Sequence, residues 1–221
     1  MIIVIEGTDG SGKQTQTKLL VEYLKAQGFD VKTQSFPNYE SDSSFFVKKY
    51  LNGDFGGLNA LSPFASSTFF ALDRLITMES YKSYLSNGGV LVLDRYVSSN
   101  ILHQGGKILD KAERENFCKK LEDFEYKDLN LPKEDLTIFL DLDPKISDKL
   151  REERGILKSG TKKDIHESDS EYLHRCYEFG IIQAKNNNWE IIKCYDENGI
   201  LSINDIHQKI VQKVNTLLKR K

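Results

Sequence analysis

The 221-residue chain contains only three cysteines, and none of them belongs to a CxxC motif. Cys118, Cys176 and Cys194 are odd in number and lie far apart in the sequence. This pattern argues against a disulfide framework and against a cysteine-rich zinc site. It suits a reducing compartment, so we expect a cytoplasmic protein.

The sequence also lacks a strong charge bias and a long hydrophobic run. Its 31 Lys and Arg residues nearly balance its 33 Asp and Glu residues, which leaves a formal net charge of −2. This balance argues against a protein that is held on nucleic acid by overall basic charge. The apolar start MIIVIEG has no basic segment and is interrupted by Glu6, so we interpret it as neither a secretory signal nor a membrane span. We expect no nucleic-acid partner and no membrane association.

Short apolar runs alternate with longer segments of helical periodicity. Several runs are continuous rather than alternating, which is typical of parallel strands buried on both faces of a sheet. The predicted strands lie at residues 2–5, around Val31, and at residues 90–93, 136–140 and 189–194. This alternation predicts a three-layer α/β fold with a central five-stranded parallel sheet flanked by helices.

The predicted helices connect these strands. They lie at residues 13–27, 63–85, 111–124, 144–153 and 170–185. A last helix follows Ser202, which can form a capping box with Asp205. No repeat or low-complexity linker divides the chain, so we interpret residues 1–221 as a single domain. The polar stretch at about residues 151–169 is a candidate for a short lid.

The stretch IEGTDGSGKQTQ follows the first predicted strand and opens the first predicted helix. Its Gly7, Gly12 and Lys13 fit the phosphate-loop spacing GxxxxGK. Glycines let backbone N–H groups converge on phosphate oxygens, and the lysine reaches the β- and γ-phosphates of ATP. The ATP-binding residues that we predict in this loop are Gly7, Asp9, Gly10, Ser11, Gly12, Lys13, Gln14 and Thr15.

The expected metal site departs from the usual pattern at one position. Gln14 stands where a Ser or Thr hydroxyl usually binds magnesium, and a glutamine carbonyl can hold the ion either directly or through a water. Asp94 and Arg95 follow the run VLVL, at the strand end where α/β folds bind ligands. We expect Asp94 to anchor Mg²⁺ and Arg95 to bind a phosphate. These residues indicate phosphoryl transfer or nucleotide hydrolysis with Mg²⁺ and ATP.

Four blocks, IEGTDGSGKQTQ, FPNY, STFFALDR and DRYVSSN, together resemble thymidylate kinase in order and spacing. The resemblance covers nearly the whole chain and implies a P-loop kinase fold. It also implies a transferase that moves the ATP γ-phosphate to dTMP, giving dTDP and ADP for dTTP synthesis, usually as a homodimer. The catalytic residues that it implies are Lys13, Asp94, Arg95 and Arg154. Arg154 is included because Gly10 replaces the arginine that some members carry in the loop, and Arg151 is a nearby ATP contact.

The resemblance further implies an acceptor pocket. Asp9 matches the acid near the deoxyribose 3′-hydroxyl, Phe70 the ring that stacks on thymine, and Arg74 the donor to the base. Phe70 and Arg74 lie four residues apart on one predicted helix, so they share a face. In the family the Phe36–Pro37 bond is typically cis. The predicted dTMP-binding residues are Asp9, Phe36, Pro37, Tyr39, Phe70, Arg74, Arg95, Ser99, Asn100, His103 and Gln104.

Two of these positions depart from the family pattern, and other readings stay open. Tyr39 stands where some members have an arginine on the acceptor phosphate. His103 stands where many have Tyr or Phe near the sugar C2′, so we expect weaker discrimination of dTMP from UMP. One alternative is a kinase for another nucleoside monophosphate, namely UMP, dUMP or CMP. Another is a nucleotide-binding protein without catalysis.

Overall fold

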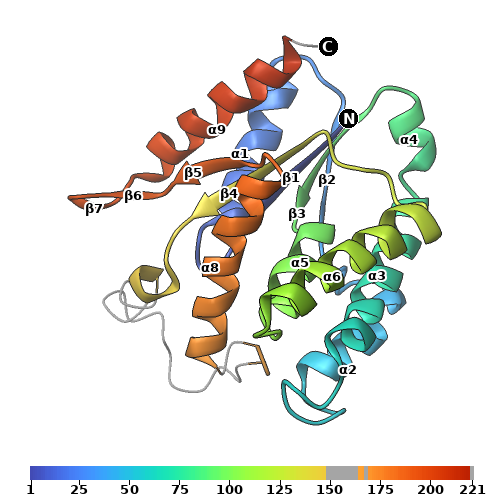
Figure 1. Cartoon of the computed structure of the whole chain (residues 1–221). Coiled ribbons are helices and arrows are strands. Elements are labelled where there is room, and N and C mark those ends of the chain that lie inside the picture. The colour runs from blue at the N-terminus through green and yellow to red at the C-terminus, as the bar shows by residue number, and fades with distance from the viewer. Residues whose placement is uncertain (148–163, 167–168, 220–221) are drawn as a thin grey trace.

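The structure is a computed structural model of the chain and describes residues 1–147, 164–166 and 169–219. At its centre is a parallel sheet of five strands in the order β2-β3-β1-β4-β5 (Figure 1). The strands are β1 (Ile2–Gly7), β2 (Val31–Ser35), β3 (Val90–Asp94), β4 (Leu136–Asp141) and β5 (Glu190–Lys193). The predicted five-stranded parallel sheet is thus confirmed.

Helices cover both faces of the sheet, because alternate residues of the buried strands point to opposite sides. On one face, Ile3 and Ile5 of β1 pack in a core cluster with Leu20 of α1 (Lys13–Ala26) and Ile210 of α9 (Ile203–Leu218). On the other face, Ile2 and Val4 pack with residues of α3 (Pro63–Glu79) and α5 (Val97–Gly105). The helix α8 (Ser170–Asn186) joins α5 on this second face. The predicted three layers are confirmed.

The smaller elements lie at the edges of these layers. They are a 3₁₀ turn at Asp42–Ser44, α2 (Phe45–Leu51), α4 (Lys82–Ser86), α6 (Lys111–Glu122), a π-helical segment at Asp123–Asp128, and a hairpin of β6 (Tyr195–Asp196) and β7 (Gly199–Ile200). The cap of α9 is confirmed in part. The backbone N–H of Asp205 donates to Ser202 Oγ at 3.1 Å, but the Asp205 carboxylate accepts from the Ser202 hydroxyl rather than from its backbone.

The prediction of a single helix at residues 63–85 is wrong. Helix α3 ends at Glu79, and its last turn tightens because the N–H groups of Ser80 and Tyr81 each bond a carbonyl three residues back. The Ser80 hydroxyl also donates to the carbonyl of Thr77 at 2.7 Å, a side-chain bond that competes with continued helix. The chain resumes as the separate helix α4. Of the helix predicted at residues 144–153, residues 144–147 are helical and the rest lies outside the described residues.

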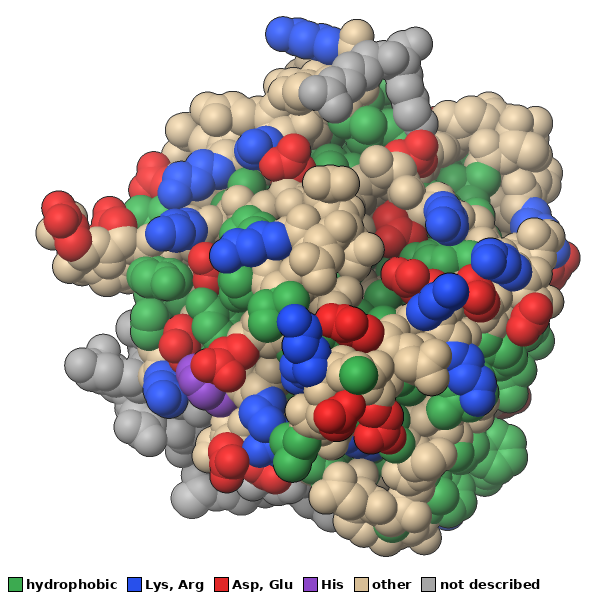
Figure 2. All heavy atoms as spheres, in the orientation of Figure 1, with side chains coloured by type: hydrophobic (Ala, Val, Ile, Leu, Met, Phe, Trp, Pro, Cys, Tyr) green, Lys and Arg blue, Asp and Glu red, His purple; other side chains and the backbone are tan. Residues whose placement is uncertain are grey.

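The surface carries charges of both signs. On the face shown in Figure 2, Lys and Arg side chains are intermixed with Asp and Glu side chains, in keeping with the formal net charge of −2. Helix α3 also exposes the apolar side chains of Leu72 and Ile76, which are 46% and 59% exposed. Among the described residues, we find no helix with both the length and the apolar character needed to span a membrane.

Candidate active site

The phosphate loop joins β1 to α1 and passes very close to β4. A Cβ atom built on Gly7 would lie 2.7 Å from Ser11 Oγ and 3.0 Å from the carbonyl oxygen of Leu140. At the other end of the loop, Gly12 has the left-handed φ of 87° at the start of α1, a conformation that glycine adopts without steric cost. These two glycines give the loop the course that the sequence motif predicts.

Lys13 is buried in this loop, with 8% of its side chain exposed. Its Nζ donates to the carbonyl of Thr8 at 2.8 Å and lies 3.6 Å from the carboxylate of Asp9. Burial lowers the pKa of Lys13, as does the neighbouring charge of Arg95, while Asp9 acts in the opposite direction. The ammonium thus lies at the base of the loop, next to an acidic partner.

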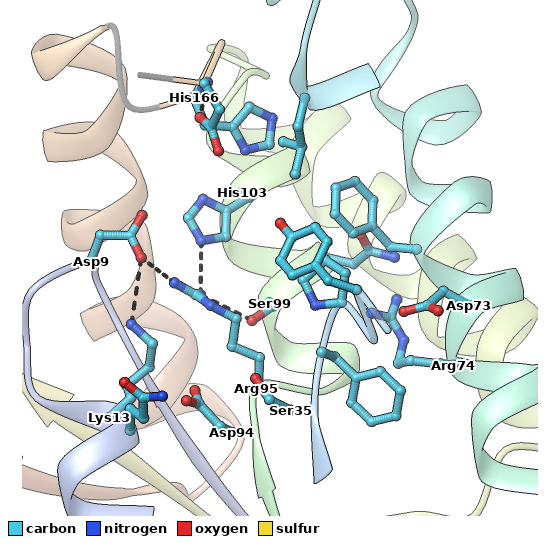
Figure 3. A pocket seen from close by; sticks show the side chains of 18 of the residues that line it. Asp9, Lys13, Ser35, Asp73, Arg74, Asp94, Arg95, Ser99, His103 and His166 are labelled. Atoms are coloured by element: carbon cyan, nitrogen blue, oxygen red, sulfur yellow. Dashed lines mark hydrogen bonds and ion pairs between the residues drawn. The ribbon is translucent and has the colours of Figure 1, made fainter. Parts of the chain in front are cut away.

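Arg95 follows β3 with a left-handed φ of 71°. Such a conformation is uncommon for a residue with a side chain, and the surrounding structure must hold it. The Arg95 backbone N–H donates to the carbonyl of Ile5 at 3.1 Å, which fixes this turn against β1. The side chain then extends along the cavity between the phosphate loop and α5 (Figure 3).

The guanidinium of Arg95 has partners on three sides. Its Nη2 donates to Asp9, and its Nη1 lies 3.3 Å from Ser99 Oγ and 3.2 Å from His103 Nε2. Glu6 Oε1 lies 3.4 Å from the same Nη1. Burial alone would lower the pKa of Arg95, but the nearby carboxylates, led by Asp9, raise it overall. The group therefore stays cationic, as its predicted role in binding a phosphate requires.

Glu6 is a buried charge that the sequence reasoning treated only as the end of an apolar run. It is 0% exposed, and its Oε2 accepts hydrogen bonds of 2.7 Å from the hydroxyls of Ser98 and Ser99. Its Oε1 accepts from the backbone N–H of Gly7 at 2.9 Å. Glu6 thereby joins the phosphate loop, α5 and Arg95 in one network.

Asp94 lies at the end of β3 with one carboxylate oxygen unsatisfied. Its Oδ1 is buried and has no hydrogen-bond partner within the part of the chain that the structure describes. Burial raises the pKa of Asp94, while Lys13 and Arg95 act in the opposite direction. Gln14 and Thr15 are exposed at the start of α1 and line the same cavity. A carboxylate oxygen without a donor, beside an amide, is a set of oxygen ligands that fits Mg²⁺ or its bound water.

A cavity of about 550 Å³ extends from the phosphate loop to α3. This volume lies within the usual range for small-molecule sites. The structure brings all the residues that were predicted around dTMP into its wall: Asp9, Phe36, Pro37, Tyr39, Phe70, Arg74, Arg95, Ser99, Asn100, His103 and Gln104. The Phe36–Pro37 bond is cis. From the predicted ATP site, Gly10, Gly12, Lys13, Gln14 and Thr15 also line this cavity, whereas Gly7 and Ser11 do not.

Arg74 lies at the end of the cavity away from Lys13 (Figure 3). Its side chain is only 2% exposed, and its Nε and Nη2 donate to the two oxygens of Glu125 at 2.7 and 2.6 Å. Asn100 Nδ2 donates to the same carboxylate at 2.8 Å. Gln104 lies nearby on α5. Its Oε1 accepts from Ser66 Oγ, and its buried Nε2 has no partner in residues 1–147, 164–166 and 169–219. This end of the cavity is therefore rich in fixed hydrogen-bond donors.

The sequence model of the thymidylate kinase family matches residues 5–210. The chain belongs to the thymidylate kinase family. A thymidylate kinase of Plasmodium falciparum is 31% identical over 218 residues, which cover 97% of this chain and 90% of that protein. One from Mycobacterium tuberculosis is 31% identical over 176 residues, covering 79% and 81%. The solved structure of thymidylate kinase from Candida albicans shares the fold, with a TM-score of 0.74 at 23% identity over 100% of this chain and 93% of that one.

Membership in the thymidylate kinase family confirms the predicted α/β P-loop kinase fold and the predicted enzyme class, a phosphoryl-transferring kinase. Five cavity residues of this family member were not predicted from the sequence: Ser35, Leu51, Asp73, Asp164 and His166. Asp164 and His166 come from the end of the predicted lid, and the ring of His166 lies against that of His103, with centroids 5.6 Å apart. Their only signal was a polar, charge-rich segment. Arg151 and Arg154, the predicted lid cations, lie outside the described residues.

Proposed function

We propose that this thymidylate kinase family member transfers the γ-phosphoryl group of ATP to dTMP, giving dTDP and ADP for dTTP synthesis. One observation carries the proposal. The residues expected around dTMP come from the phosphate loop, the segments after β2 and β3, and helices α3 and α5, yet all of them line a single cavity beside Lys13. A nucleotide-binding protein without an acceptor has no need for this second set of residues.

At one end of the cavity, the residues suit two phosphates. Lys13 binds the β- and γ-phosphates of ATP, and Arg95 binds the phosphate of dTMP. In the structure the guanidinium of Arg95 is paired with Asp9. When the acceptor phosphate takes this cation, Asp9 becomes available to the 3′-hydroxyl of the sugar. No general base is needed, because phosphoryl transfer relies chiefly on positioning and on neutralising charge.

At the other end, the residues suit a pyrimidine with carbonyl oxygens. Phe70 stacks on the ring, and Arg74 donates from the guanidinium N–H groups that Glu125 does not use. The buried Nε2 of Gln104 has no partner among the described residues and is a second donor for this base. Thymine presents carbonyl oxygens as acceptors, whereas cytosine presents an amino donor at C4. These donors therefore favour dTMP over CMP.

In this proposal Asp94 and Gln14 would hold Mg²⁺ or its bound water. The ion would supply positive charge that neutralises the transferring phosphoryl group. The variant Gln14→Ser tests this role, because it restores the usual hydroxyl. We expect its rate to reach half-maximum at a different Mg²⁺ concentration from wild type under saturating ATP and dTMP. Superimposable Mg²⁺ titrations would remove Gln14 from the metal site.

Further parts of the proposal concern the lid, the assembly and the location. Arg154, with Arg151, supplies positive charge from a lid at about residues 151–169 of a single-domain chain. The exposed apolar side chains of Leu72 and Ile76 on α3 support a homodimer, since pairing would cover them. The three cysteines are free and buried, which is in keeping with a cytoplasmic location.

A coupled assay of ADP release, with Mg²⁺-ATP and dTMP, dUMP, UMP and CMP in turn, tests the acceptor. We expect the highest kcat/KM with dTMP. Turnover of UMP or CMP without turnover of dTMP would overturn the proposed substrate. Tight ATP binding with no turnover of any monophosphate would favour a protein without catalysis.

A further inference from the structure

His166 and His103 form a stacked pair above Arg95 in the cavity (Figure 3). Their ring centroids are 5.6 Å apart and their planes differ by 15°. His166 is only 6% exposed. It is fixed to α2, because the backbone N–H of the preceding Ile165 donates to the carbonyl of Leu51 at 3.1 Å. The end of the predicted lid thus rests on the acceptor pocket through an imidazole.

The hydrogen bonds that Tyr50 makes to His166 and Arg95 makes to His103 indicate the protonation state of the two imidazoles. Lys107 Nζ donates to the hydroxyl oxygen of Tyr50, and an ammonium can only donate. The Tyr50 hydroxyl lies 3.0 Å from His166 Nε2, and with its oxygen accepting from Lys107 it keeps its own proton to donate to that nitrogen. At the other end Arg95, which also only donates, bonds His103 Nε2 at 3.2 Å. In this arrangement both imidazoles accept at Nε2 and are neutral.

The surroundings favour these neutral forms. Burial lowers the pKa of His103 to about 4, and Arg95 adds to this effect. Burial also holds the pKa of His166 well below its usual range, with further contributions from His103 and Lys107. Asp9 acts in the opposite direction on both rings and is outweighed. At neutral pH both imidazoles therefore stay uncharged, and the hydrogen bonds from Lys107 through to Arg95 keep the same donors and acceptors.

We propose that His166 is a positioning residue of the acceptor site. Lys107 and Tyr50 hold its ring, the ring holds His103, and His103 holds the guanidinium of Arg95 in the direction of the acceptor phosphate. This inference rests on the proposed function of the cavity. A ring that only filled space would need neither the hydroxyl of Tyr50 at its Nε2 nor a partly buried lysine behind that hydroxyl.

The variants His166→Ala, His166→Gln and Tyr50→Phe test the inference in the full-length protein. We expect His166→Ala to raise the KM for the monophosphate about tenfold while the KM for ATP stays within about twofold. The loss of one hydrogen bond in Tyr50→Phe should raise the KM for the monophosphate about fivefold, which corresponds to about 1 kcal/mol. The amide of His166→Gln can accept from Tyr50, so this variant should recover to within about threefold of wild type. Tyr23→Phe, whose hydroxyl bonds Asn215 on α9, is the matched control and should leave both KM values unchanged.

Thermal melting of each variant separates positioning from folding. An equal rise of both KM values, or an unchanged monophosphate KM in His166→Ala, would overturn the inference. The inference would also be overturned if His166→Gln had the melting temperature of wild type but the raised monophosphate KM of His166→Ala. The series uses the best monophosphate acceptor of the wild-type protein. If that acceptor is not dTMP, the proposed function fails by itself, and the positioning role of His166 is still decided.

Discussion

The guanidinium of Arg95 forms an ion pair with the carboxylate of Asp9, 86 residues earlier in the chain. This pair ties the phosphate loop to the segment after β3. A phosphate dianion offers the same guanidinium a stronger and bidentate partner. If Arg95 binds the acceptor phosphate as proposed, binding exchanges one partner of Arg95 for another and releases the carboxylate of Asp9 beside the acceptor sugar. The proposed function thus couples the acceptor to the phosphate loop through this exchange.

Arg95→Ala should damage use of the acceptor far more than binding of ATP. A hydrogen-bonded contact to a charged group contributes about 1.5–3 kcal/mol, or roughly 10- to 150-fold in affinity. We expect the KM for dTMP to rise by this factor, while the dissociation constant of ATP, measured by calorimetry, changes by less than about threefold. The control is Arg175→Ala, which removes an arginine paired with Glu171 on α8. Equal losses of dTMP and ATP binding in Arg95→Ala would contradict the assigned role.

Phe70 and Phe69 are neighbours on α3 with different surroundings. Phe70 lines the cavity, whereas Phe69 stacks on Phe46 at a centroid distance of 5.7 Å. Stacking of a base on an aromatic ring is worth about 1–3 kcal/mol, so Phe70→Leu should raise the KM for dTMP by at least about fivefold. Phe69→Leu should lower the melting temperature and leave this KM within about twofold. If steady-state kinetics show the same change for both variants, Phe70 does not stack on the base.

The buried pair of Arg74 and Glu125 makes a prediction about stability. Glu125 is 0% exposed and also accepts from Asn100. Removing one partner of a buried pair leaves an uncompensated charge, which costs about 3–5 kcal/mol. We expect Glu125→Ala to lower the free energy of unfolding by this amount in urea denaturation. The control is Glu115→Ala, because the Glu115 side chain is 64% exposed in a surface ion pair and its loss should cost less than about 1 kcal/mol. Similar losses of unfolding free energy in both variants would show that the Arg74 charge is not buried without a partner in Glu125→Ala.

His103 makes stability depend on pH. Burial, assisted by Arg95, lowers the pKa of its imidazole to about 4, whereas a histidine in an unfolded chain titrates near 6.5. Between these values the unfolded state binds more protons, so the contribution of neutral His103 is complete above pH 6.5 and is lost as the pH falls toward 4. His103→Gln should reduce the slope of unfolding free energy in this range by up to about 1.4 kcal/mol per pH unit. Parallel curves for the two proteins would show that His103 is not buried as a neutral ring.

Most of the sheet could be predicted because β1, β3, β4 and β5 contain local apolar runs. The edge strand β2 has the sequence VKTQS, so only its position around Val31 could be predicted. Helix α2 was not predicted, because it has only seven residues and its exposed Phe45 and Phe46 mask the apolar face that Val47, Tyr50 and Leu51 bury. The break between α3 and α4 was missed for a related reason. The Ser80 hydroxyl donates to the carbonyl of Thr77 in its own helix, and the sequence alone does not distinguish such a serine from one that faces solvent.

The site could be predicted where residues lie in compact motifs, as at Lys13 or Arg95. Glu6, Glu125 and His166 were missed because their roles depend on partners far away in the sequence. Glu125 is 51 residues from Arg74, and His166 is 116 residues from Tyr50. The role of a buried charge or imidazole depends on contacts with residues that are distant in the sequence, and no local sequence pattern predicts those contacts.

The most direct test of the account is to follow the γ-phosphate itself. Wild-type protein is incubated with Mg²⁺ and ATP labelled at the γ-phosphate, with and without dTMP, and the products are separated by chromatography. We expect the label to appear in dTDP in step with ADP, and Lys13→Ala to abolish both. Label released as inorganic phosphate at the same rate with and without dTMP, and no labelled dTDP, would contradict the account.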